Sequence, residues 1–205
     1  MGTFCGAKMT SWASSLDTAL FHLINRGGEN SYFDVFMPFM TDLKNFTYVL
    51  ALLGGWILWK EKKAGLGFLI FIALTLAMTD SFSSRLLKEW VGRIRPCQIL
   101  SEVRLLTDCN TSYSFPSSHA VNIFAAAYFL SQPFRRLAPV FYAIAAVVGY
   151  SRVYLGIHYP LDVMGGAAIG LLIAWPMRWL KDLALDRLGW LSAASAKPQA
   201  PNPKK

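Results

Sequence analysis

Three short stretches of the chain carry residues that could bind and transfer a phosphate group. In sequence order they read KEWVGRIRP, PSSH and SRVYLGIHYPLD. The candidate residues in them are Lys88, Arg95, Ser117, Ser118, His119, Arg152, His158 and Asp162. Lysine and arginine neutralise phosphate oxygens, while histidine can act as a nucleophile or exchange a proton. Together the stretches therefore predict a phosphate site that holds its own nucleophile and acid.

Three cations are the candidate phosphate ligands. Phosphoryl transfer spreads negative charge over three equatorial oxygens, and Lys88, Arg95 and Arg152 can neutralise this charge without a metal. The alternative for any one of them is a cation at a helix end that reaches the lipid headgroups. The complete set, in one chain with two histidines and a carboxylate, favours the phosphate site.

The PSSH stretch predicts a helix start that binds an anion. Pro116 precedes Ser117, Ser118 and His119, and an apolar run follows directly. Free backbone N–H groups and the positive end of the helix dipole would face the phosphate, and the serine hydroxyls can add donors. Simple capping of the helix by serine is compatible with this interpretation.

The spacing of His158 and Asp162 suits a nucleophilic imidazole. Pro160 lies between them and predicts a turn into the last helix, so that Asp162 falls in the first helical turn. There its carboxylate can accept a bond from one imidazole nitrogen and leave the other unprotonated. Two alternatives are histidines that only satisfy hydrogen bonds at the membrane interface and a zinc site, although three cations nearby would repel a metal.

The order and spacing of these motifs resemble the signature of the type 2 phosphatidic acid phosphatase superfamily. That signature is Lys, six residues, Arg-Pro; then Pro-Ser-Gly-His; then Ser-Arg, five residues, His, three residues, Asp. The chain matches every position but one, where Ser118 replaces glycine. The resemblance implies a membrane lipid phosphatase without metal or cofactor. It also implies that His158 forms a phosphohistidine, while His119 protonates the leaving oxygen and later activates water.

The composition predicts an all-α, polytopic membrane helix bundle. Of 205 residues, 54% are hydrophobic and only 16% are charged, and the mean hydropathy is +0.36. Apolar runs cover residues 46–59, 64–79, 120–134, 137–150 and 161–179. Most are shorter than the roughly 20 residues that cross a bilayer, unless their polar ends continue the helices. We therefore expect five to six transmembrane helices, with the candidate catalytic residues at helix ends.

The chain divides into three predicted parts. Residues 1–45 are an N-terminal segment whose amphipathic stretches 13–24 and 32–43 suit interfacial helices, the alternative being a sixth, poorly hydrophobic span. Residues 46–190 are the membrane-embedded phosphatase domain. Residues 191–205, rich in Ala, Pro, Lys and Ser, are expected to be a disordered tail.

Basic residues predict the orientation in the membrane. They gather in two connections and after the last span, all on one side of a five-span bundle: Lys60, Lys62, Lys63, Arg135, Arg136, Arg178, Lys181 and Arg187. The positive-inside rule makes that side cytoplasmic. The active site then faces the periplasm or exterior of a bacterial inner (plasma) membrane. Cys97 and Cys109 would flank an outer loop, either as a disulfide or as free thiols.

The predicted partners are the bilayer and a lipid phosphate or diphosphate, with no nucleic acid. The best substrate hypothesis is undecaprenyl pyrophosphate, and phosphatidylglycerophosphate, phosphatidic acid and lipid A are the alternatives. A soluble vanadate-dependent haloperoxidase of the same superfamily fits neither the apolar runs nor the short chain. A transporter-like membrane protein is the non-enzyme alternative, but it gives no reason for the collected cations, histidines and aspartate.

Overall fold

The computed structural model describes residues 11–190, which form helices and connecting loops without a strand. The elements are α1 (Ser11–Asn25), α2 (Ser31–Thr41), α3 (Thr47–Ser81), α4 (Lys88–Val91), α5 (Pro96–Ile99), α6 (Ser118–Ser131), α7 (Ala138–Tyr154) and α8 (Pro160–Arg187). Single turns of other helix types cover Leu43–Phe46, Phe82–Leu87 and Arg135–Leu137. The expected all-α class is confirmed, and the predicted tail lies outside the described residues.

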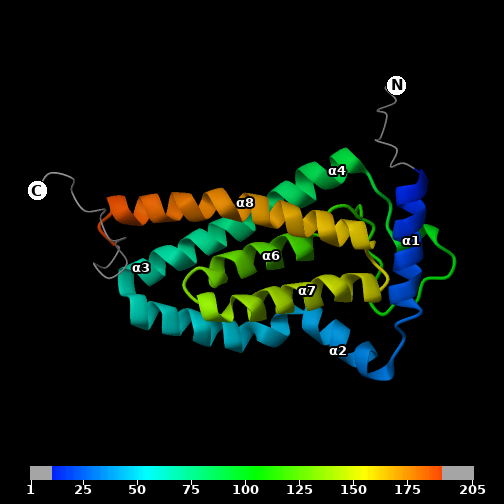
Figure 1. The fold of residues 1–205 in the computed structure, drawn as a ribbon, viewed down its shortest axis with the longest axis horizontal. Helices are drawn as coiled ribbons and strands as arrows, with labels where there is room; N and C mark the ends of the chain where they lie inside the picture. The colour runs from blue at the N-terminus through cyan, green and yellow to red at the C-terminus, as the bar shows by residue number, and fades with distance from the viewer. Residues whose placement is uncertain (1–10, 191–205) are drawn as a thin grey trace, which may run out of the picture.

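The helix α3 folds back on itself at Lys62. Lys62 has a non-helical backbone, with φ of 49° and ψ of −119°. The halves of α3 on either side of it run next to each other in opposite directions (Figure 1). The second half continues through the π-helical turn Phe82–Leu87 into α4, so one rod carries the first motif to the far end of the bundle.

The helices α6 and α8 pack backbone against backbone at the centre of the bundle. A Cβ atom at Gly166 would lie 2.8 Å from the carbonyl oxygen of Ser117, and one at Gly170 would lie 2.2 Å from that of Val121. Glycines four residues apart allow two membrane helices to approach this closely. The start of α6 is therefore held in place directly by the first turns of α8.

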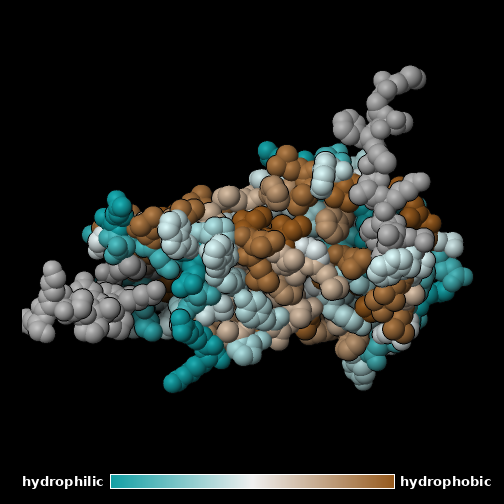
Figure 2. All heavy atoms as spheres, turned by 45° about the horizontal axis from the view of Figure 1, so that its top comes forward, coloured by the Kyte–Doolittle hydropathy of each residue, from teal (hydrophilic) through white to brown (hydrophobic). Residues whose placement is uncertain are grey.

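Among residues 11–190, three stretches are long and apolar enough to cross a membrane: Leu43–Ile99, Arg135–Tyr154 and Pro160–Arg187. The first contains the fold-back at Lys62, while α6 has only 14 residues. On the face shown in Figure 2, hydrophobic residues cover the middle of the long axis and hydrophilic residues gather toward its ends. The number of spans, five to six, stays a prediction.

The N-terminal helix α1 lies across one end of the bundle rather than along it (Figure 1). It contacts α7 and α8, and its buried Phe21 packs against Val153 and Tyr159. The buried side-chain amide of Asn25 donates to the carbonyl oxygens of Arg104 and Tyr154, both at 2.8 Å. The following helix α2 contacts α7. The N-terminal segment is thus attached at the end of the bundle that carries all three motifs.

Candidate active site

The third motif spans the turn from α7 to α8. Arg152 lies in the last turn of α7, and its carbonyl oxygen accepts the backbone N–H groups of Ile157 and His158 at 3.3 and 3.2 Å. This tight turn requires Gly156, which has a φ of +86° that favours glycine. As predicted, Pro160 begins α8, and Asp162 lies in its first turn.

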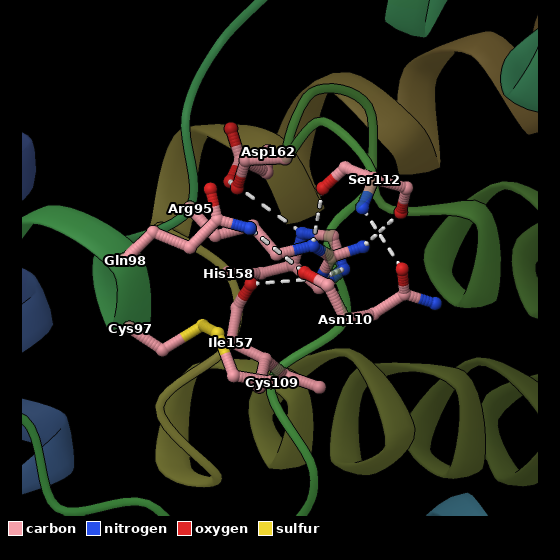
Figure 3. The surroundings of a disulfide bond; sticks show 10 residues. Arg95, Cys97, Gln98, Cys109, Asn110, Ser112, Ile157, His158 and Asp162 are labelled. Atoms are coloured by element: carbon pink, nitrogen blue, oxygen red, sulfur yellow. Dashed lines mark hydrogen bonds and ion pairs between the residues drawn. A yellow bond between two sulfur atoms is a disulfide. The ribbon is translucent and has the colours of Figure 1, made fainter.

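The side chain of Arg95 connects the first motif to His158 (Figure 3). Its Nε and Nη2 donate to the carbonyl oxygen and hydroxyl of Ser112, at 2.8 and 3.0 Å. Its Nη1 donates to the carbonyl oxygen of Ile157 at 3.0 Å and lies 3.1 Å from Nε2 of His158. Because an arginine side chain only donates hydrogen bonds, Nε2 must be the acceptor and carry no proton. The proton of a neutral His158 is therefore on Nδ1.

The Nδ1 of His158 faces Asp162, but more loosely than expected. Its distance to Oδ2 of Asp162 is 3.5 Å. The reason is that other donors already occupy this carboxylate: the Ser114 hydroxyl, the backbone N–H of Tyr159 at 2.8 Å and the guanidinium of Arg93 at 2.7 Å. Burial lowers the pKa of His158 to about 4, although Asp162 acts to raise it. The imidazole is thus neutral at pH 7.

The start of α6 lies next to these groups. Ser117 is the N-cap and donates its backbone N–H to the carbonyl oxygen of Asp162 at 3.1 Å. Ser118 and His119 follow in the first helical turn. Free N–H groups of this turn can bind an anion, as the sequence predicts. The hydroxyl of Ser118 accepts a 3.3 Å bond from Ser83, which ties it to the rod that carries Lys88.

One cavity of about 300 Å³ brings most of the predicted site together. It is lined by Lys88, Arg95, Ser118, His119, Arg152, Ile157 and His158, and by the loop residues Thr107, Asp108, Asn110 and Ser112. Asp162 and Ser117 are fully buried and support these residues from behind. Three buried polar atoms of the site have no hydrogen-bond partner among the described residues: Oγ of Ser117, Nε of Arg152 and Nδ1 of His158. The arrangement can hold a multiply charged anion beside an unprotonated imidazole nitrogen.

A second cavity of about 360 Å³ adjoins the first on the side of His119. Both cavities are lined by His119, Arg152 and Thr107, and the second does not reach His158. Its remaining lining comes from the end of α2 and the turn after α7: Pro38, Thr41, Asp42 and Leu155. The hydroxyl of Thr41 accepts a 2.7 Å bond from Arg152. The N-terminal segment thus contributes to the surroundings of the site.

A disulfide joins Cys97 to Cys109 beside the cavity (Figure 3). It closes the loop that supplies Thr107 and Asp108, and it fixes the chain just before Asn110 and Ser112. Gln98 strengthens the same closure by donating to the carbonyl oxygen of Asn110 at 2.9 Å. Of the two alternatives that the sequence leaves open, the structure therefore has the disulfide.

Sequence reasoning missed several supporting residues. Arg93 lies within the first motif and pairs with Asp162 and with Asp17 of α1. A cation two residues before Arg95 was visible in the sequence, but nothing there indicated its partners. Ser112 and Thr41 are ordinary polar residues whose spacing gives no signal.

Comparisons with known proteins give the same assignment. A sequence profile of the PAP2 superfamily matches residues 64–184. The chain is 32% identical over 178 residues to a lipid A 4'-phosphatase of Bacteroides thetaiotaomicron, covering 82% of this chain and 77% of that protein. It is 30% identical over 117 residues to an undecaprenyl-diphosphatase of Sulfolobus acidocaldarius, covering 57% of this chain and 54% of that protein.

The fold also matches a solved structure. A transmembrane PAP2-type phosphatidylglycerolphosphate phosphatase from Bacillus subtilis superimposes with a TM-score of 0.65 at 28% identity, covering 86% of this chain and 90% of that one. The profile match includes more than half of the chain and contains all three motifs. The resemblance carried by these motifs is therefore confirmed, and the chain belongs to the PAP2 superfamily.

Proposed function

We propose that the protein is an integral-membrane lipid phosphatase that works through a phosphohistidine on His158 and needs no metal. The observation that carries the proposal is the contact between Arg95 Nη1 and His158 Nε2 at 3.1 Å. It shows that Nε2 carries a lone pair and not a proton, at the edge of a cavity that three cations line; the guanidinium must move from this lone pair to the phosphate before Nε2 can attack. A nucleophile and the charges that neutralise its target are thus in one place.

Binding comes first in the proposed reaction. The phosphate group enters the 300 Å³ cavity, where Lys88, Arg95 and Arg152 neutralise its oxygens. The N–H groups at the start of α6 and the hydroxyl of Ser118 add hydrogen bonds. Arg95 also holds the imidazole, so binding of phosphate and alignment of the nucleophile depend on the same side chain.

Transfer then proceeds in two steps. Nε2 of His158 attacks phosphorus, an N–P bond forms and the bond from phosphorus to the leaving oxygen breaks; in a diphosphate this is the bridging oxygen. His119 gives its proton to that oxygen. Burial and the nearby cations lower the pKa of His119 to about 3 in the free protein, so the negative charge of the bound phosphate must raise this pKa before His119 carries the proton. In the second step His119 takes a proton from water, the oxygen of which attacks phosphorus and breaks the N–P bond. Inorganic phosphate leaves and both histidines return to their initial states.

The part of the lipid next to the leaving oxygen would occupy the second cavity. In an in-line displacement the leaving oxygen lies opposite the nucleophile. His119 lines both cavities, whereas His158 lines only the first. The side of the phosphate that faces away from His158 therefore opens toward α2, and Pro38, Thr41 and Asp42 would contact the leaving group.

The residues around the site support a reaction without a metal. Within residues 11–190, no group of three His, Cys, Asp or Glu side chains is placed to hold a metal ion. The positive charge that a metal would supply is present on Lys88, Arg95 and Arg152. His119 and His158 line the same cavity as these cations, which would repel a metal ion from the two imidazoles.

Undecaprenyl pyrophosphate remains the best substrate hypothesis, with phosphatidylglycerophosphate, phosphatidic acid and lipid A as alternatives. Named relatives include phosphatases of lipid A, phosphatidylglycerophosphate and undecaprenyl diphosphate. We further propose that the site faces the periplasm or exterior of a bacterial inner membrane. The basic fold-back at Lys62 and the connection at Arg135–Leu137 lie at the opposite end of the bundle (Figure 1).

A phosphate-release panel tests this function. The purified full chain in detergent would be given each of the four lipid classes, with and without EDTA. We expect release from at least one lipid that EDTA leaves unchanged and vanadate inhibits. Enzyme denatured and kept at alkaline pH, where a phosphohistidine is stable, should carry label from a phosphate-labelled substrate, and His158→Ala should carry none. Activity that requires added divalent ions, or label that persists in His158→Ala, would contradict the proposed chemistry.

A further inference from the structure

The first turn of α8 is anchored by a residue far away in the sequence. Asp17 of α1 is almost fully buried, with 1% of its side chain exposed. Its Oδ1 accepts the backbone N–H of Leu161 at 2.9 Å. This N–H belongs to the start of α8 and has no partner within that helix. Asp17 therefore caps α8 from another helix, one residue before Asp162.

Arg93 joins the same aspartate to Asp162. Its Nη2 lies 2.5 Å from Oδ2 of Asp17, and its Nη1 lies 2.7 Å from Oδ1 of Asp162. The guanidinium also stacks over the ring of Tyr159, 4.0 Å from its centroid. Arginine suits this place because its planar fork reaches two carboxylates at once. Asp17, Arg93 and Asp162 thus form one buried chain of charges that ends at His158.

Neither Asp17 nor Arg93 is placed to touch the substrate. The linings that the described residues give to the two cavities include neither of them. Arg93 occupies one of the six unspecified positions between Lys88 and Arg95 in the signature. Asp17 lies outside residues 64–184, the part that matches the superfamily profile. A role for this pair is therefore not part of the three motifs.

We propose that Asp17 and Arg93 are positioning residues that hold Asp162, and through it His158, in the reactive orientation. The inference rests on the proposed role of His158 as nucleophile. Asp162 contacts Nδ1 of His158 at only 3.5 Å, so the carboxylate itself must be fixed for this contact to orient the imidazole. Arg93 fixes one oxygen, and Ser114 and the N–H of Tyr159 fix the other. The helix α1 thereby supports the site, although none of its described residues lines either cavity.

The pair should affect turnover and leave phosphate binding unchanged. Loss of Arg93 removes the donor to Oδ1 of Asp162. The carboxylate can then rotate, and it no longer orients the imidazole. Lys88, Arg95 and Arg152 still line the cavity, so the affinity for phosphate stays the same. A residue that supported only the fold would instead lower the fraction of active protein without changing the turnover of each active molecule.

The test uses the purified full chain with four variants: Asp17→Asn, Arg93→Met, Arg93→Lys and the double variant Asp17→Asn/Arg93→Met. The measurements are kcat and KM for phosphate release, the inhibition constant for inorganic phosphate, and the phosphoenzyme burst that counts active sites. We expect kcat per active site to fall about 10- to 100-fold in Arg93→Met, with the inhibition constant within about twofold of the wild-type value. Arg93→Lys should recover part of the loss, because lysine keeps the charge and lacks the fork.

The double variant separates a shared role from two independent ones. If Asp17 acts through Arg93, the double variant should lose no more than Arg93→Met alone. The matched control is the exposed ion pair between Arg26 and Glu102, with side chains 53% and 68% exposed, which also connects the N-terminal segment to the outer loop. Arg26→Met and Glu102→Gln should leave kcat unchanged.

Three results would overturn the inference. One is a kcat per active site within twofold of wild type in both Arg93→Met and Asp17→Asn. Another is an inhibition constant that rises together with the loss of kcat, which would make Arg93 a phosphate ligand. The third is an equal loss in the Arg26 and Glu102 controls. If Arg93→Met does not fold, Arg93→Lys and Asp17→Asn, which keep size and shape better, give the same readout. Absence of phosphatase activity in the wild type would instead refute the proposed function.

Discussion

Ser117 donates its backbone N–H to the carbonyl oxygen of Asp162 at 3.1 Å. This bond joins the capping residue of the anion-binding helix α6 to the first turn of α8, which carries the carboxylate behind His158. Gly166 brings the two backbones close at the same level. The proposed phosphate cradle and the proposed nucleophile are thus parts of one rigid unit.

Removal of the proposed nucleophile, His158, should abolish activity, whereas a change of its partner Asp162 should leave part of it. We expect His158→Ala to abolish phosphate release, because the imidazole proposed to form the covalent intermediate is removed. Asp162→Asn should keep a small fraction of activity, since the imidazole remains but its tautomer and orientation are no longer fixed. Steady-state rates of matched, purified variants measure both. Substantial turnover by His158→Ala would refute its role.

Acid should destabilise the protein through His158. The pKa of this imidazole is about 4 in the folded protein, against 6.5 for the free side chain. The unfolded chain therefore binds a proton first, and stability is lost as the pH falls from 6.5 to 4. The full loss is about 3 kcal/mol. Thermal midpoints in detergent should fall less between pH 7.5 and 4.5 for His158→Gln than for the wild type. An equal fall in both proteins would contradict a lowered pKa of His158.

Position 118 should tolerate glycine and reject a branched apolar side chain. Ser118 lines the cavity in the first turn of α6. Ser118→Gly keeps the backbone donors and should retain or raise activity, whereas Ser118→Val crowds the anion and removes a hydroxyl. Phosphate release at matched protein levels compares the two. Equal activity of Ser118→Val and the wild type would show that this position does not face the phosphate.

Opening the disulfide should weaken phosphate binding through Arg95. The bond between Cys97 and Cys109 fixes the chain three residues before Ser112, which holds the guanidinium of Arg95. In Cys97→Ser/Cys109→Ser we expect a several-fold rise in the inhibition constant for inorganic phosphate. The loss of a short covalent loop should also cost about 3 kcal/mol of stability. Cys5→Ser is the control, and an unchanged inhibition constant in the double variant would show that the loop holds Arg95 without the bond.

The two ends of the bundle should react differently with a thiol reagent that does not cross membranes. Glu102 lies at the end that carries the site and Lys62 at the opposite fold-back, and both side chains are exposed. In intact cells a Cys5→Ser background with Glu102→Cys should be labelled from outside. The same background with Lys62→Cys should be labelled only after permeabilisation. The reverse pattern would place the active site in the cytoplasm.

Much of the site could be predicted from the sequence because the motifs carry their own local geometry. Pro160 marks the start of a helix, so the position of Asp162 in its first turn follows from the chain itself. The start of α6 at the PSSH stretch is equally local. The gathering of the cations around His158 followed from the resemblance of the motifs, and the structure brings them to one cavity.

The rest could not be predicted because it depends on side chains from distant parts of the chain. Asp17 and Arg93 are 76 residues apart, and Thr41 and Arg152 are 111 residues apart. No periodicity or spacing indicates such pairs. The expected hydrogen bond between His158 and Asp162 is not formed at the observed 3.5 Å, and two of the donors that compete for the carboxylate, Arg93 and Ser114, come from distant parts of the chain.

The glycine contact between α6 and α8 has a consequence for engineering the enzyme. With Gly170 so close to the backbone of Val121, the two helices cannot separate or slide without losing their packing. Substitutions at the contact between α6 and α8 should therefore be poorly tolerated. Pro38, Thr41 and Asp42, in contrast, border the second cavity from the end of α2, outside this contact. Under the proposed function, exchange of α2 between relatives should change the lipid preference, and it should keep Thr41, whose hydroxyl holds Arg152.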